Sequence, residues 1–124
     1  MSTPFTFQTT NTILYCQRWA ETVAFYRQVL GLPVTVEKDW FVEFALTDSA
    51  RLSVADEQRA RIKSSGGVGI TLTFQVADIQ AAWQRVADGG GAPGPLRRHA
   101  WGAQLFYLHD PESHRLEFWS PLAA

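Results

Sequence analysis

The order of hydrophobic and polar positions predicts a βαβββ arrangement in the first half of the chain. Residues 11–17 are apolar on both faces in their middle, as in a buried strand, and residues 20–30 carry apolar side chains at helical spacing. Gly31 is suited to the helix C-terminus, and Pro33 prevents the helix from continuing. Three short strands are then predicted, over residues 33–37, 40–46 and 51–54.

The same order of elements is predicted again after a polar connector, residues 56–67. Residues 68–76 are dense in Ile, Thr, Leu and Phe, which favours a strand. Asp78 is a good N-cap for a helix that ends at the glycine-rich stretch 88–91. Three further strands are predicted over residues 95–98, 103–108 and 115–120. Residues 1–10 are polar and predict a loose arm.

Residue identities recur between the two halves at one constant spacing, as an internal repeat requires. The matches pair Gln17, Ala24, Arg27 and Gly31 with Gln75, Ala82, Arg85 and Gly89. We therefore predict an α+β fold with a single domain over residues 1–124, built from two βαβββ modules at about 11–55 and 67–120. Because the strands are apolar on both faces, the curved mixed sheets should surround a cup-shaped cleft, a common kind of small-molecule site.

Composition limits the classes of partner. The net charge is −1, which offers no field for nucleic acid or for an anionic membrane. Cys16 is the single cysteine, so no internal disulfide forms, and we expect a reducing compartment and a structural role for this thiol. No apolar run approaches the roughly 18 residues of a membrane span, and residues 1–10 lack the features of a signal peptide. A soluble cytoplasmic protein is expected.

The last predicted hairpin places a carboxylate between aromatic residues. In its outgoing strand, Glu117 shares one face with Trp119. Two roles for Glu117 stay open. It could accept a structural hydrogen bond from Asn11 or Arg98 across the cup, or it could bind a ligand as a carboxylate in an apolar site. His109 and His114 flank the turn of this hairpin and are expected to be exposed.

Two stretches resemble the vicinal oxygen chelate superfamily, which includes glyoxalase I, extradiol dioxygenases, fosfomycin resistance enzymes and bleomycin resistance proteins. One is the helix end Ala24–Pro33 (AFYRQVLGLP), and the other is the closing hairpin His109–Trp119 (HDPESHRLEFW). With the repeat, the resemblance covers nearly the whole chain. It implies the two-module fold and a homodimer, because many members build the cup from two chains, and it says little about the ligand.

The resemblance also implies four positions for the ligands of a divalent metal. Their counterparts are Asn11, Ser53 (or Leu52 in a shifted register), Ile70 (or Gly69) and Glu117. Only the carboxylate of Glu117 matches the expected ligand type, since Ile and Gly have no ligating group and Asn and Ser are poor ligands for soft metals. No metal site and no cofactor are therefore expected, unless the protein is an enzyme with a divalent metal at a different site.

Eleven residues are expected to line the cup or its mouth. They are Asn11, Ile13, Tyr15, Trp40, Ser53, Ile70, Leu72, Arg98, Trp101, Tyr107 and Glu117. For Tyr15 and Trp40 packing in the core is an equal alternative, and the loop around Trp101 could instead be a solvated surface loop.

Three functions remain open. The first, favoured by the lost metal ligands, is a metal-free binding protein of the bleomycin-resistance type that sequesters an aromatic or cationic small molecule. The second is a glyoxalase-like lyase, isomerase or dioxygenase with a divalent metal at a non-standard site, so whether the chain is an enzyme stays undecided. The third is an interaction module that keeps only the fold.

Overall fold

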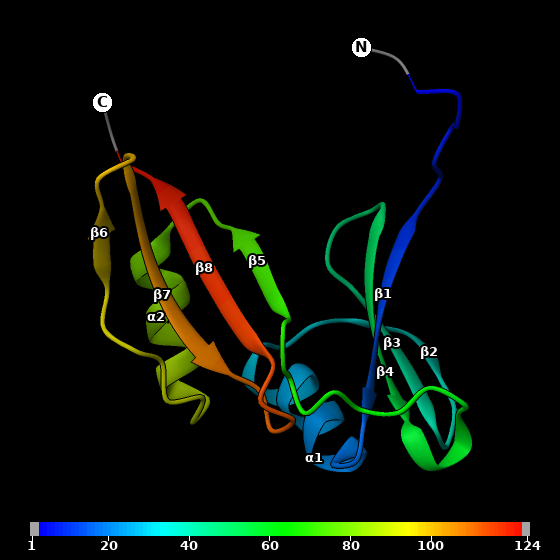
Figure 1. Ribbon diagram of the computed structural model, residues 1–124. Helices are drawn as coiled ribbons and strands as arrows, with labels where there is room; N and C mark the ends of the chain where they lie inside the picture. The colour runs from blue at the N-terminus through cyan, green and yellow to red at the C-terminus, as the bar shows by residue number, and fades with distance from the viewer. Residues whose placement is uncertain (1–2, 123–124) are drawn as a thin grey trace.

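The computed structural model describes residues 3–122 and contains two four-stranded mixed sheets with helices behind them (Figure 1). The first half comprises β1 (Thr10–Cys16), α1 (Trp19–Ala24), η1 (Phe25–Val29), β2 (Val34–Glu37), β3 (Phe41–Ala45) and β4 (Ala50–Asp56). After the short η2 (Glu57–Arg59), the second half comprises β5 (Thr71–Gln75), α2 (Ile79–Asp88), β6 (Arg97–His99), β7 (Ala103–His109) and β8 (Arg115–Pro121). The predicted repeat of two βαβββ modules is confirmed.

The two sheets have the same topology. Sheet one has the order β1-β4-β3-β2, and sheet two has the order β5-β8-β7-β6. In each sheet the first strand of the module pairs in parallel with the last, and the other pairs are antiparallel. The edge strands β1 and β5 lie next to each other where the sheets meet (Figure 1).

Both modules contribute to one hydrophobic core. Its fully buried members include Tyr26 and Phe44 from the first half and Phe106 and Leu116 from the second. The apolar positions that predicted the helices are the ones that face this core, as Ile79 and Val86 of α2 show. None of the helices in residues 3–122 is long and apolar enough to cross a membrane.

The first predicted helix ends in a wider turn than its sequence pattern indicates. After α1, residues Phe25–Val29 form a π-helical turn, in which the Leu30 amide donates to the Phe25 carbonyl at 3.2 Å. Both aromatic residues at the start of this turn, Phe25 and Tyr26, are buried. Gly31 follows with φ +68°, a conformation that glycine adopts readily and that ends the helix.

A buried aspartate in the β7–β8 turn joins the two modules. Asp110 Oδ2 accepts a hydrogen bond from the Tyr26 hydroxyl at 2.7 Å and lies 2.8 Å from Nδ1 of His114. Its Oδ1 accepts from the amides of Glu112 and His114, both at 2.9 Å. The prediction that His114 is exposed is wrong, because its ring is buried beside Asp110; His109 is exposed as predicted.

Glu112, from the same turn, binds the chain at the start of α1. Its two carboxylate oxygens accept from the amides of Gln17 and Arg18, each at 2.8 Å, and from the hydroxyl of Ser64 in the connector. Burial raises the pKa of Glu112, but the hydrogen bonds from Ser64 and the two amides outweigh it, so the net pKa lies below the ordinary value. The carboxylate therefore stays ionised while buried.

Cys16 lies in the core near this pair of carboxylates and is fully buried. Burial, followed by the charges of Glu112 and Asp110, raises the pKa of its thiol to about 12. A thiol that stays protonated is a poor nucleophile, in agreement with the structural role expected for Cys16.

Replacement of Glu112 by Gln should destabilise the protein in a pH-dependent way. At neutral pH we expect the free energy of unfolding to fall by about 1.5–3 kcal/mol, because hydrogen bonds to a charged group are lost. The folded pKa lies below the ordinary value of 4.5, so the stabilisation is complete above that pH and disappears as the pH falls through the folded value. Urea denaturation across this range measures the difference, with the exposed Asp39→Asn as control; a difference that does not shrink on acidification would contradict the assignment.

Candidate functional site

Each sheet has one face on the core and one face directed away from it, which we call outer face one (β1–β4) and outer face two (β5–β8). In β8, Leu116 packs in the core, and the alternation of side chains places Glu117 and Trp119 on outer face two. In β1, Leu14 and Cys16 are in the core, so Tyr15 and the other alternate residues of the strand belong to outer face one.

Glu117 lies in the middle of outer face two and is held by neighbouring strands. Its Oε1 accepts a hydrogen bond of 2.6 Å from the Thr73 hydroxyl of β5. Tyr107 of β7 is its direct cross-strand partner, and desolvation, together with hydrogen bonding to Glu117, raises the pKa of this phenol. The guanidinium of Arg115 lies 4.6 Å from the centre of the Tyr107 ring.

Aromatic rings adjoin this carboxylate. The rings of Trp101 and Trp119 meet edge to face with centroids 5.6 Å apart, and His99 lies 6.0 Å from Trp101. Trp101 remains 62% exposed, which is unusual for an indole side chain. Outer face two therefore offers aromatic faces and one carboxylate to a ligand.

Outer face one carries a separate polar network. Asn11 Oδ1 accepts from the Ser53 hydroxyl at 2.8 Å, and Asn11 Nδ2 donates to Glu43 Oε1 at 3.4 Å. The other oxygen of Glu43 accepts from Thr35 at 2.6 Å and lies 3.9 Å from the guanidinium of Arg51. Glu43 was not identified from the sequence, although a lone carboxylate inside an apolar strand was a signal for it.

The structure brings together only part of the expected set. Asn11 and Ser53 are hydrogen-bonded, but within residues 3–122 no hydrogen bond or ion pair connects them to Glu117. The hydrogen bond from Asn11 or Arg98 to Glu117, part of one of the two roles left open, is not formed, and Thr73 provides a donor instead.

Two expected wall residues lie elsewhere because of the register of β5. Thr73 pairs with Glu117, so Leu72 pairs with Leu116 on the core side. Ile70 precedes the strand and belongs to neither face. The sequence could not fix these positions, because an apolar run does not say which of its residues face the core, and a one-residue shift exchanges the faces.

The register of β6 likewise places Arg98 on the side of the sheet away from Glu117. In β6, Arg98 pairs with Gln104, whose neighbours Phe106 and Leu108 are core residues, so both lie on the core side of the sheet. The residues before and after it, Arg97 and His99, share outer face two with Tyr107.

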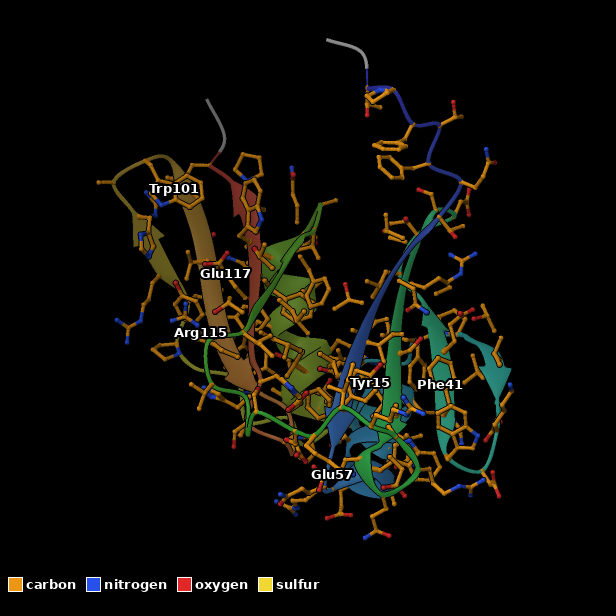
Figure 2. All side chains as sticks on the ribbon, turned by 45° about the vertical axis from the view of Figure 1, so that its right-hand side comes forward. Tyr15, Phe41, Glu57, Trp101, Arg115 and Glu117 are labelled. Carbon is orange, nitrogen blue, oxygen red and sulfur yellow. The ribbon has the colours of Figure 1, made fainter. Side chains whose placement is uncertain are left out.

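The remaining candidates of the first half lie on or beside outer face one. Ile13 and Tyr15 are on this face, and Ile13 is 38% exposed. Tyr15 and Phe41 flank Ala55 in the sheet, and Figure 2 shows both side chains on this half of the molecule. Trp40 precedes β3 and is half-buried against Phe41, with ring centroids 5.4 Å apart.

The residues at the expected metal positions do not fit a zinc, nickel or iron ion. The registers of β1 and β5 make Thr71 the counterpart of Asn11, because Ile13 pairs with Ser53 as Thr73 pairs with Glu117. The donors are then two hydroxyls, one amide and one carboxylate, without a His or Cys. Within residues 3–122, no group of three or more His, Cys, Asp or Glu side chains could hold a metal ion.

Comparisons with known proteins agree with this architecture. The sequence profile of the glyoxalase/bleomycin resistance protein/dioxygenase superfamily matches residues 8–118. No curated protein matches the chain. Among solved structures, a glyoxalase/bleomycin resistance protein/dioxygenase from Nocardioides is similar with a TM-score of 0.77 and 19% identity, over 100% of this chain and 88% of that one.

Two further structures show the range of activities on this fold. Lactoylglutathione lyase from Agrobacterium tumefaciens has a TM-score of 0.73 and 20% identity, over 90% of this chain and 91% of that one. TnmS3, an antibiotic binding protein from Streptomyces sp. CB03234, has a TM-score of 0.77 and 14% identity, over 97% of this chain and 99% of that one. At these identities the likeness shows the fold alone.

The donor set predicts that the protein does not retain a metal ion. After incubation with Ni²⁺, Fe²⁺ or Zn²⁺ and exhaustive dialysis, elemental analysis should find far less than one ion per chain, because hydroxyl and amide oxygens bind these metals weakly. Asn11→Ala and Glu117→Gln should leave the metal content unchanged. Stoichiometric metal in the wild type, lost in either variant, would contradict this reading of the site.

Proposed function

Because the chain belongs to the glyoxalase/bleomycin resistance protein/dioxygenase superfamily, we propose that it is a small-molecule binding protein that works without a metal. Its ligand is an aromatic molecule with a protonated amine or another N–H donor, and it binds against outer face two. The observation that carries the proposal is the exposed indole of Trp101, packed edge to face on the half-buried Trp119, on the same face as a fixed carboxylate, Glu117.

The contacts of Glu117 leave it free to accept from a ligand. A carboxylate has about four acceptor sites, and the Thr73 hydroxyl uses one of them. The neighbouring cation, Arg115, already donates to the Thr71 hydroxyl at 3.1 Å and stacks on Tyr107. A ligand with a flat ring and an N–H donor therefore meets an indole and an acceptor at once.

The similar structures include a binding protein and an enzyme. The four residues at the expected metal positions favour binding over metal-dependent catalysis. TnmS3 is described as an antibiotic binding protein, whereas the Agrobacterium relative is a lyase. A lyase or dioxygenase activity of the kind expected from a metal-dependent member would need a divalent ion, for which Asn11, Ser53, Thr71 and Glu117 are a poor set. Sequestration of the ligand needs none.

We further propose that the working form is a homodimer in the cytoplasm. Apolar side chains remain exposed on both outer faces, including Ile13 at 38% and Trp101 at 62%. A second chain that laid its outer face one over outer face two would cover them and would add Tyr15 and Glu43 to the site. Light scattering should then report twice the 13.9 kDa mass of one chain.

Titration calorimetry with bleomycin and with proflavine, a planar aromatic cation, tests the binding proposal. We expect Glu117→Gln to weaken binding of the ligand about tenfold, which is about 1.4 kcal/mol for one charge-assisted hydrogen bond. Trp101→Ala should weaken it several-fold, since an exposed cation–π contact contributes about 0.5–1 kcal/mol.

Matched variants separate these effects from general damage to the surface. Glu37→Gln removes an exposed carboxylate of β2, and Phe5→Ala removes an aromatic ring that is 64% exposed, as Trp101 is at 62%. Neither should change the affinity. The proposal is refuted if neither compound binds, or if Glu117→Gln and Glu37→Gln have the same effect.

A further inference from the structure

A second concave site lies between the two modules. Two adjoining cavities of about 290 and 350 Å³ share Leu46, Thr47 and Phe74 in their walls. The first is lined mainly by apolar side chains, among them Leu30, Leu32, Val86 and Phe118. We call this region the module cleft; its size is within the range of small-molecule sites.

The two modules meet at two related junctions, each between the helix of one module and the last hairpin turn of the other. The cleft exists because a side chain closes one of these junctions and leaves the other open. At the closed junction, Tyr26 reaches Asp110 and fills the space with a fully buried ring. In the repeat, Gln84 corresponds to Tyr26 at the spacing of the helices. In the hairpins, Phe44–Asp48 (FALTD) matches Phe106–Asp110 (FYLHD), so Asp48 corresponds to Asp110. Both are exposed, and Gln84 donates to Asp88 at 2.8 Å instead, so neither of them fills the second junction.

A positive charge lies in the wall of this cleft. Arg85 of α2 lines the first cavity and is exposed, which places it at the rim. Its Nε and Nη2 approach the carbonyls of Val29 and Gln28 at 3.3 and 3.5 Å, at the long end for hydrogen bonds. Within residues 3–122 no carboxylate lies within ion-pair distance of Arg85, whereas its repeat counterpart Arg27 binds Glu37 at 2.7 Å.

We infer that the module cleft binds an apolar carboxylate, with the alkyl or aryl body among the leucines and phenylalanines and the carboxylate on Arg85. The five N–H groups of a guanidinium match a carboxylate well, and at most two of them are used by the carbonyls. The apolar walls provide the main driving force, and the charge selects acids over neutral chains. The apolar first cavity, with Arg85, is on the opposite side of the sheets from Glu117, whereas the second cavity also reaches Thr73, the donor to Glu117. The inference does not depend on the function proposed above.

Titration calorimetry with decanoate and with decan-1-ol, both below their aggregation limits, tests the inference. Decanoate should bind one per chain, and the alcohol about tenfold more weakly. Arg85→Gln should weaken decanoate about tenfold and leave the alcohol unchanged. The matched control Arg27→Gln removes the corresponding arginine of the first module, outside the cleft, and should change neither affinity. Ala82→Phe, which adds bulk inside the cavity, should weaken both ligands.

Several results would overturn the inference. They are no binding of decanoate, equal effects of Arg85→Gln and Arg27→Gln, or loss of decanoate binding in Glu117→Gln, which would place the acid on outer face two. A dimer that Ala82→Phe converts to a monomer, in a protein that binds no decanoate, would assign the cleft to a second copy of the chain. The proflavine titration remains a separate readout, so failure of either proposal is recognised on its own.

Discussion

The two modules depend on the burial of two carboxylates in one turn. A buried charge without partners is strongly unfavourable, so Asp110 and Glu112 require donors, and the decisive ones belong to the other module. Tyr26 donates to the first, and the amides of Gln17 and Arg18 donate to the second. These amides lie at the start of α1, where backbone N–H groups lack partners within the helix. One set of hydrogen bonds thus satisfies the turn, the helix start and the contact between modules.

This constraint determines where ligands can bind. It draws the core faces of both sheets onto a common set of helices and leaves exposed side chains on each outer face, such as Ile13 and Trp101. The two outer faces then differ in chemistry. Outer face one holds a self-satisfied network around Glu43, whereas outer face two combines Glu117 with the exposed indole of Trp101. Outer face two therefore keeps a hydrogen-bond acceptor and an aromatic surface available for a ligand.

The elements of the fold could be predicted from the sequence because their signals are local. Apolar periodicity, the N-cap Asp78 and Gly31 each act over a few residues, and the repeat gave the order of strands. The faces of the strands could not all be predicted. The hydrogen bond between Asn11 and Ser53 and the core-side position of Leu72 both depend on strand register, and the register of β5 depends on its pairing with β8, which is distant in sequence.

The burial of polar residues could not be predicted from the sequence either. His114 looked like a surface residue of a turn, and only the position of Asp110 beneath it explains why it is buried. Glu43 shows the reverse case, because its isolation in an apolar strand was visible but its partners come from three other strands. In each case the partner, and not the residue type, decides the environment.

The difference between the closed and open junctions also bears on how such a chain can change over time. A duplicated module begins with two equivalent junctions, and the bonds of Asp110 and Glu112 show that one is enough to hold the halves together. At the other junction, positions such as Gln84 and Asp48 are exposed and carry no buried charge. Substitutions there leave the core intact, so selection can reshape that side of the molecule while the closed side preserves the fold.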